Sequence, residues 1–325
     1  MSQTSHRMLG PGQVIVTGSL AFDNIMDFPG HFKDHILADK AHVINISFLV
    51  ERLSRQRGGC AANIAYTLAL LGQSPRIVAT AGHDFADYQS WLASQGVDTS
   101  AIEIHPDEMT ACCFITSDRA HCQITGFYPG AMKRARELSL VERAGGTTAV
   151  VVISPDDPEA MVRHCREAQG AGLPFVFDPS FQVTAMDGAT IAGAADGALA
   201  LVVNDYEFTV LREKTGKTVE QLQREHELVV VTYGAQGSEI LLKDGGVVKV
   251  PAARPHEVID PTGAGDAFRG GLVAGLMQGY ELGVCGRIGA LAAVYCIECY
   301  GTSNHRFSSE DFATRYRETF GTDLP

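Results

Sequence analysis

The sequence predicts an α/β fold in which a mostly parallel sheet is covered by helices on both faces. Short runs rich in β-branched residues alternate with longer segments of helical periodicity, as expected of strand–helix–strand units. The 325 residues suit one large domain or two small ones, and they contain no internal repeat and no low-complexity linker. We expect strands at 14–17, 76–79, 149–153, 175–177, 200–203 and 228–232, and helices at 60–71, 84–95, 158–170, 206–214, 264–278 and 284–299.

Two segments, 20–48 and 109–127, break this alternation. Both are strand-rich, lack a strong helical pattern and carry aromatic residues such as Phe32 and Phe127. We expect them to pair as a small β-lid over the carboxyl edge of the sheet, where ligands of such sheets bind. The alternative is two unrelated surface hairpins. The predicted organisation is a single domain over residues 1–325 with these two segments as its lid.

Charge and composition exclude several functional classes. The net charge is −12 and no cluster of Lys and Arg is dense enough to neutralise several phosphates, which argues against nucleic-acid and membrane-surface partners. No apolar run reaches membrane-spanning length, and the polar N-terminus lacks the apolar core of a signal peptide. The eight cysteines lack the paired spacing of a secreted framework, and Cys296 and Cys299 have no second pair to complete a zinc site. We expect a cytoplasmic protein that acts on small molecules.

Residues 260–268, Asp-Pro-Thr-Gly-Ala-Gly-Asp-Ala-Phe, combine an anion site with a carboxylate. Gly263, Ala264 and Gly265 open a predicted helix and can direct consecutive backbone N–H groups at one anion, while the helix dipole adds positive potential. Asp266 lies in the first turn, where the same field is expected to keep its carboxylate ionised. A phosphate site beside a fixed carboxylate is what phosphoryl transfer to an alcohol requires. The alternative is a plain glycine-rich turn into a core helix.

Three further segments carry polar groups at places suited to ligands. Residues 58–63 place a double glycine and an asparagine at the start of a predicted helix, which otherwise is an ordinary turn. Asn204 and Glu207 follow a predicted strand and offer the hard oxygen ligands that suit a hydrated Mg²⁺, or alternatively a helix cap. Residues 232–237 end another strand with two glycines, suited to a nucleotide or to a simple hairpin turn.

In their order along residues 14–320, these segments resemble the ribokinase (PfkB) family of carbohydrate and nucleoside kinases. The resemblance implies a ribokinase-like three-layer α/β/α fold and a kinase that uses ATP as its phosphoryl donor. Within residues 260–268 it implies that Gly263, Ala264 and Gly265 form the anion hole and that Asp266 is the catalytic base.

The resemblance also implies a substrate clamp and a magnesium position. Asp23 matches the aspartate that holds two hydroxyls of the sugar ring, and Gly59 and Asn63 match the other side of that clamp. Asn204 and Glu207 match the pair that organises Mg²⁺ through water, and Asn204 also belongs to the ATP site.

Two more sets of family positions complete the predicted site. Thr232, Gly234 and Gly237 match the loop at a strand end that receives ATP. Asp260 and Thr262 match positions that ligate K⁺ in family members that need a monovalent cation.

The substrate class rests on finer features. The segments 32–36, 46–48, 59–63 and 123–130 resemble the bacterial adenosine-kinase-like nucleoside kinases. This branch implies phosphorylation of the 5′-hydroxyl of a purine nucleoside, with Gln123 bonded to the base edge and Phe127 or Tyr128 stacked on the base. The alternatives are a sugar kinase for ribose, fructose or a keto-deoxy acid, and a non-catalytic nucleoside or nucleotide sensor. The oligomeric state stays open between monomer and homodimer.

Overall fold

A nine-stranded sheet runs through the protein in the order β13-β12-β11-β10-β9-β8-β1-β4-β5. The computed structural model describes residues 9–34, 47, 49–120 and 122–325. The strands from β11 to β5 pair in parallel, while β12 and β13 are antiparallel. All six predicted strands lie in this sheet, and β5, β12 and β13 were not among the predicted strands. The strands are β1 (Gln13–Thr17), β4 (Arg76–Gly82), β5 (Ile102–His105), β8 (Thr148–Ile153), β9 (Phe175–Phe177), β10 (Ala200–Asn204), β11 (Leu228–Thr232), β12 (Ser238–Leu242) and β13 (Val247–Val250).

Helices cover both faces of this sheet, which confirms the predicted three layers. Val14 and Val16 of β1 pack in one hydrophobic cluster, and Ile15 packs in a second cluster on the opposite face. The first face carries α1 (Cys60–Leu70), α2 (Ala86–Ser94), α8 (Ala264–Gln278) and α9 (Leu282–Ile297), with α10 (Ser309–Phe320) packed on α9. The second face carries α3 (Leu140–Ala144), α4 (Pro158–Ala171), α5 (Gly188–Ala195), α6 (Asp205–Thr215) and α7 (Val219–Glu225). Short 3-10 helices are η1 (Phe32–Asp34), η3 (Gly130–Glu137), η4 (Ser180–Thr184) and η5 (Gly234–Gln236).

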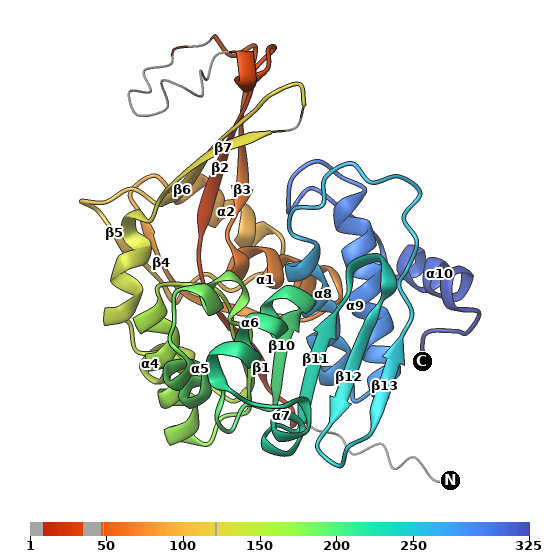
Figure 1. Ribbon diagram of the computed structural model, residues 1–325. Helices are drawn as coiled ribbons and strands as arrows, with labels where there is room; N and C mark the ends of the chain where they lie inside the picture. Colours follow the sequence, from red (N-terminus) through yellow and green to blue (C-terminus); the bar gives the residue numbers. More distant parts are fainter. Residues whose placement is uncertain (1–8, 35–46, 48, 121) are drawn as a thin grey trace.

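A separate four-stranded sheet, in the order β3-β2-β6-β7, rises above the body of the molecule in Figure 1. Its strands are β2 (Ala21–Asp27), β3 (Arg52–Gly58), β6 (Ala111–Ser117) and β7 (Gln123–Tyr128). Strand β2 pairs in parallel with β6, so the segments 20–48 and 109–127 do lie against each other. Residues 35–46 and 48 of the first segment lie outside the described residues. The sequence analysis missed β3, because Arg-Leu-Ser-Arg-Gln-Arg-Gly contains no β-branched residue and forms a strand only by pairing with β2.

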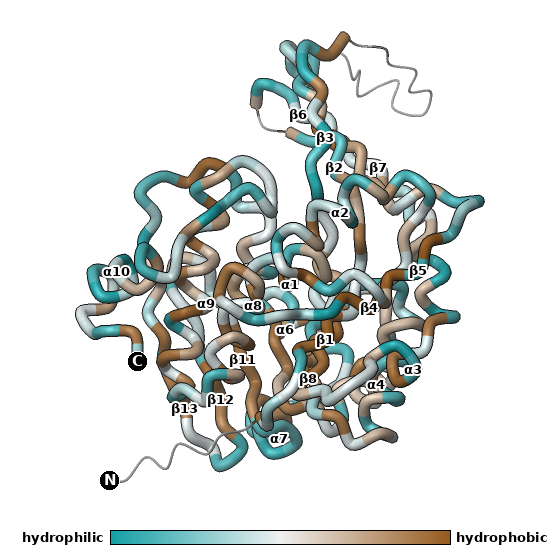
Figure 2. The backbone as a smooth tube through the Cα atoms, turned by 180° about the vertical axis from the view of Figure 1, so that it is seen from behind, coloured by the Kyte–Doolittle hydropathy of each residue, from teal (hydrophilic) through white to brown (hydrophobic). Residues whose placement is uncertain are grey.

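Hydropathy follows this architecture. Figure 2 shows hydrophobic residues concentrated in central strands such as β1, β8 and β11, whereas many of the outer loops are hydrophilic. Strands buried on both faces need apolar side chains on both, which is why these runs do not alternate. Within the described part of the chain, no helix is both long and apolar enough to cross a membrane.

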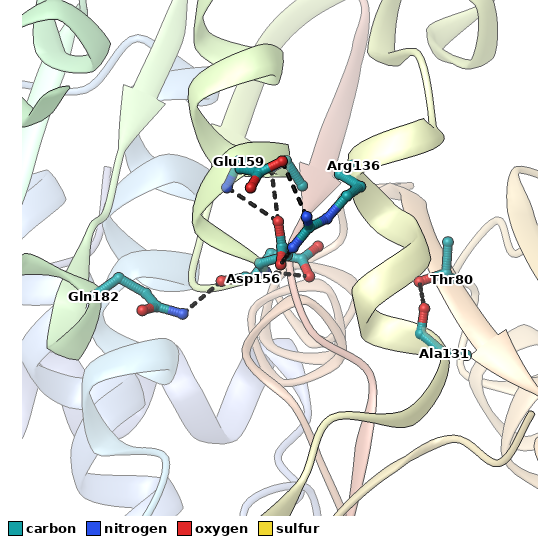
Figure 3. A network of polar contacts seen from close by, with 8 residues as sticks. Thr80, Ala131, Arg136, Asp156, Glu159 and Gln182 are labelled. Carbon is teal, nitrogen blue, oxygen red and sulfur yellow. Dashed lines mark hydrogen bonds and ion pairs between the residues drawn. The ribbon is translucent and has the colours of Figure 1, made fainter. Parts of the chain in front are cut away.

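A polar network fixes the connection from β8 into α4 (Figure 3). The Asp157 carboxylate caps α4 by accepting from the Glu159 and Ala160 N–H groups, and it also accepts from Arg136 Nη2 at 2.5 Å. Gln182 Nε2 donates to the carbonyl oxygen of Asp156 at 2.6 Å. The Asp156 carboxyl is buried, which raises its pKa to about 8. These contacts fix the loop that leaves the carboxyl end of β8, the strand between β9 and β1 in the large sheet.

Candidate active site

The carboxyl ends of the parallel strands bring the predicted motifs to one edge of the large sheet. Asn204, the last residue of β10, is the register partner of Thr232, the last residue of β11. The Gly59 that precedes α1 and the Gly263 that precedes α8 belong to two helices packed against each other on one face. Ligands of open α/β sheets bind at this edge.

The turn into α8 requires glycine at its first position. Gly263 is the N-cap of α8 and has a φ of 83°, a left-handed conformation that favours glycine. A Cβ there would also lie 2.9 Å from Cβ of Thr302 and 3.3 Å from the Cys296 thiol. The N–H groups in the first turn of a helix have no partner within the helix, so this turn presents donors and the positive end of the helix dipole together.

Asp266 in the first turn of α8 is held by α1. Asn63 Nδ2 donates to Asp266 Oδ2 at 2.8 Å. The Asn63 carbonyl oxygen in turn accepts from Thr302 Oγ1 at 2.7 Å and from Ser303 Oγ at 3.1 Å. The Asn63 carboxamide therefore orients Asp266 and is itself held by Thr302 and Ser303, while the sugar-clamp role predicted for Asn63 stays a prediction.

Burial raises the pKa of Asp266 above that of an ordinary aspartate. The Arg269 charge and hydrogen bonds from Asn63 and the Cys60 thiol act in the opposite direction without cancelling this shift. The sequence analysis considered the helix field, which favours the ionised form, and did not include the loss of water, which disfavours it. A carboxylate whose pKa is raised towards neutrality is a better proton acceptor than an exposed aspartate.

Asp23 lies in β2, at the centre of the small sheet. Its side chain packs so closely on β3 that a Cβ at Gly58 would lie 2.4 Å from Asp23 Oδ2. Burial raises the pKa of Asp23 to about 6, and the negative charges of Asp260 and Asp266 add to the shift. Thr302 joins the two parts of the site, because its Oγ1 lies 2.9 Å from the carbonyl oxygen of Arg57 in β3 and 2.7 Å from Oδ1 of Asn63, the residue that holds Asp266.

Gly59 has a structural reason to be glycine that the sequence did not indicate. Its φ is 94°, and a Cβ there would lie 2.5 Å from the carbonyl oxygen of Ser19 and 2.7 Å from the Ala21 N–H group. The close approach at this glycine is thus made by residues 19–21 of the chain itself. The sequence analysis predicted that a ligand could approach the backbone at Gly59. The close contact that the structure shows at Gly59 is with residues 19–21.

Asn204 and Glu207 form a capping box at the start of α6. Glu207 N–H donates to Asn204 Oδ1 and Asn204 N–H donates to Glu207 Oε2, each at 2.8 Å. Ser180 Oγ donates to Glu207 Oε1 at 3.2 Å. The alternative reading of this pair as a helix cap is therefore what the structure shows.

The same pair fits Mg²⁺ only through intervening water. Both Glu207 oxygens already accept hydrogen bonds, and no group of three or more His, Cys, Asp or Glu within the described residues is arranged to ligate a metal directly. Mg²⁺ usually keeps several waters and takes few protein ligands, so the donor set suits an ion held by hydrogen bonds from its water shell.

The predicted ATP loop is the hairpin between β11 and β12. Tyr233 N–H donates to the Gly237 carbonyl at 2.8 Å, which closes the turn that contains Gly234. Residues 234–236 are exposed. They follow the end of β11, where Thr232 is the register partner of Asn204. The loop is open to solvent at the edge where the other motifs meet.

Asp260 joins two loops near α8. Its carboxylate accepts from the Thr262 N–H group and from the Gly301 N–H group, each at 3.0 Å. This bridge brings 301–304, which also contact Asn63, against the start of the 260–268 motif. The K⁺ role predicted for Asp260 and Thr262 stays a prediction.

The small sheet separates the residues predicted to hold a base. Phe127 lies in the same row as Asp23, because each pairs with Cys113. Gln123, the first residue of β7, lies four positions before Phe127. It is exposed and donates to Ser117 Oγ at 3.2 Å. Phe127, with 51% of its surface exposed, is therefore the better placed of the two to contact a substrate held by Asp23.

Comparison with known proteins identifies the family of this chain. The chain matches the model of the pfkB family of carbohydrate kinases over residues 30–308. It is 29% identical over 315 residues to a nucleoside kinase of Methanothermobacter thermautotrophicus, covering 96% of this chain and 98% of that protein.

Solved structures agree over nearly the whole chain. The nucleoside kinase of Burkholderia thailandensis in complex with inosine superposes with a TM-score of 0.86 at 35% identity, covering 95% of this chain and 99% of that chain. Its complex with ADP-inosine gives a TM-score of 0.81 at 36% identity, with 95% and 97% covered. The nucleoside kinase of Methanocaldococcus jannaschii gives a TM-score of 0.86 at 26% identity, with 95% and 99% covered. Since the family model spans residues 30–308, most of the sequence, this chain belongs to the pfkB family of carbohydrate kinases and is a phosphotransferase that acts on a hydroxyl group.

Proposed function

We propose that this kinase transfers the γ-phosphoryl group of ATP to the 5′-hydroxyl of a purine ribonucleoside. The observation that carries the proposal is Asp266, which α1 fixes at the glycine-rich start of α8 on the same side as Asp23. The similar enzyme from Burkholderia thailandensis was solved with inosine and with ADP-inosine, ligands that match an acceptor and a donor of this kind.

Chemistry at Asp266 follows from its hydrogen bonds. Asn63 and Cys60 hold the carboxylate, so that its remaining acceptor capacity is directed to the substrate hydroxyl. The transition state of phosphoryl transfer is loose, so the base takes the proton late and supplies little push. The N–H groups of the Gly263–Gly265 turn stabilise the charge on the transferred phosphoryl oxygens. Asn204 and Glu207 would hold Mg²⁺ through water, and the bound ion would supply further charge neutralisation.

A coupled ADP-release assay over a panel of nucleosides and free sugars tests the proposal. Inosine, adenosine or guanosine should give the highest kcat/KM. If ribose, fructose or a keto-deoxy acid is phosphorylated best, the enzyme is a sugar kinase. If a nucleoside binds and no acceptor is turned over, the protein is a sensor and the proposal is wrong.

Asp23→Ala is expected to weaken nucleoside binding by about 2–4 kcal/mol. In the proposed clamp the carboxylate accepts from the two ribose hydroxyls, and a charge-assisted hydrogen bond contributes roughly 1.5–3 kcal/mol. The dissociation constant is measured by calorimetry, with Asp27→Ala as a matched carboxylate control on the same face of β2. Equal kcat/KM for ribonucleosides and 2′-deoxyribonucleosides in the wild type would contradict the clamp.

Nucleoside binding is expected to weaken as the pH falls below about 6. Asp23, with its pKa raised to about 6, is ionised above that pH and accepts two hydrogen bonds; below it the carboxyl is protonated and loses acceptor capacity. Binding is measured from pH 5 to 8 in the wild type and in the Asp266→Asn variant, in which Asp266 does not titrate and the midpoint should lie lower, because one of the charges that raise the pKa of Asp23 is removed. A flat profile would remove Asp23 from contact with the substrate.

A further inference from the structure

Arg269 lies on α8, one turn after Asp266, and is buried among acidic side chains. Its Nε is 2.6 Å from Asp178 Oδ2, and its Nη2 is 3.8 Å from Glu207 Oε2. Only 7% of Arg269 is exposed, and Asp178, which follows β9, is completely buried. One guanidinium is therefore shared by carboxylates from two other parts of the fold.

The guanidinium also lies against the anion-binding turn. A Cβ at Gly265 would be 2.5 Å from Arg269 Nη1. Residues four apart share a helix face, and helical side chains lean towards the N-terminus, so this side chain returns its charge to the start of α8. The positive end of a helix disfavours a cation. A guanidinium at the start of α8 is therefore expected only if an anion binds beside it.

The pairing around Arg269 is incomplete as a structural ion pair. Although the Arg269–Asp178 contact is short, neither Asp178 oxygen nor Arg269 Nε has a hydrogen bond of good geometry among the described residues. Buried ion pairs are weak evidence for stability, because desolvation offsets much of the attraction. Net stabilisation of the fold is therefore a weak explanation for this arrangement.

Arg269 is also the nearby charge that opposes the effect of burial on Asp266. It lowers the pKa of Asp266, whereas Glu207 raises it. The other titratable groups that sense the charge of Asp266 lie on β2, α1, α2, α9 and the end of β9, and they are acidic, thiol or phenol groups: Asp23, Cys60, Tyr88, Cys296 and Asp178.

We propose that Arg269 is a positioning residue that braces the Gly265–Asp266 turn against Asp178 and Glu207 and adds positive charge behind the transferred phosphoryl group. It acts through the turn, and it links the base on α8 to the Glu207 cap on α6. The inference rests on the proposed role of this turn in binding the phosphoryl group.

Four variants test this role: Arg269→Met, Arg269→Lys, Asp178→Asn and the double variant R269M/D178N. Arg269→Met should lose about 10²-fold in kcat, the scale of a lost electrostatic contact at a transition state, while the acceptor KM changes less than about threefold because the Asp23 side of the site is untouched. Arg269→Lys keeps the positive charge but loses the planar guanidinium with its several donors, so its kcat should lie between those of Arg269→Met and the wild type. Arg76→Met, which removes an ion pair with Asp98 at the opposite edge of the sheet, is the control for loss of a partly buried arginine.

The double variant separates positioning from charge neutralisation. It removes the uncompensated charge of Asp178, so its Tm should return towards that of Asp178→Asn. If its kcat stays below a tenth of the Asp178→Asn value, Arg269 acts on the turn; if kcat exceeds a tenth, Arg269 only neutralises Asp178 and the inference is wrong. Should Arg269→Met fail to fold, an Arg269→Lys variant with wild-type kcat would equally overturn it.

Failure of this inference is distinguishable from failure of the proposed function. The wild-type panel identifies the acceptor first, and the variants are then compared with that acceptor, whether nucleoside or sugar.

Discussion

Replacing Asp266 with Asn is expected to lower kcat by about 10²–10⁴-fold while nucleoside binding survives, the range for loss of a general base. The substituted amide is nearly isosteric and its carbonyl oxygen can still accept from Asn63 Nδ2, so the packing between α1 and α8 is kept. It cannot take the substrate proton, and it removes a negative charge beside the transferred phosphoryl group. Initial rates at saturating ATP and nucleoside give kcat, and calorimetry gives binding.

Asp187→Asn is the matched control for this substitution. Asp187 caps α5 by accepting from the Thr190 N–H group at 2.7 Å, and asparagine is an equally good N-cap. This variant should keep wild-type kcat and Tm. An Asp266→Asn enzyme with more than about a tenth of wild-type kcat would remove Asp266 from the role of base.

Purine ribonucleosides are expected to exceed free ribose by roughly 30- to 1000-fold in kcat/KM. A free sugar forfeits the base, and with it stacking and at least one hydrogen bond, together about 2–4 kcal/mol. The enzyme would realise this binding between the small sheet and the carboxyl edge of the large sheet. Steady-state kinetics with inosine and ribose at fixed ATP measure the ratio.

Two variants in β7 locate the base. Phe127→Ala, in the row of Asp23, should reduce the preference for nucleoside over ribose, and Gln123→Ala, four positions further along the strand, serves as the comparison. A larger loss for Gln123→Ala, without a loss of ATP affinity, would place the base further out on the small sheet. An unchanged preference in both variants would mean that β7 does not contact the base.

The large sheet was predictable because its signal is local. Each central strand is an apolar run buried on both faces, and each of the six predicted helices has its own periodicity, so neither depends on a partner distant in sequence; α3, α5, α7 and α10 were not predicted. Strand β3 is different: its charged residues form a strand only because β2 offers an edge. A pairing of that kind is a tertiary effect that single-sequence propensity does not contain.

The sequence indicated the motifs of the candidate site, but it did not indicate the hydrogen bonds and ion pairs that join them. The 260–268 motif indicated Asp266 and the glycine turn, but the donation from Asn63 joins residues 203 apart in sequence. Arg269 was missed although it follows Asp266 by three residues, because an arginine in an apolar helix gives no sign of which carboxylates it meets. Its partners, Asp178 and Glu207, come from different strand ends that only the folded sheet brings together.

The most direct test of the account is the identity of the product formed from inosine and ATP. The wild-type reaction, followed by phosphorus NMR, should give a single phosphate monoester coupled to the 5′ protons of the ribose, and the Asp266→Asn enzyme should give it at least about a hundredfold more slowly. No product from any purine ribonucleoside, or a phosphate on the 2′ or 3′ oxygen, would contradict the assignment of this site as one for 5′-phosphorylation.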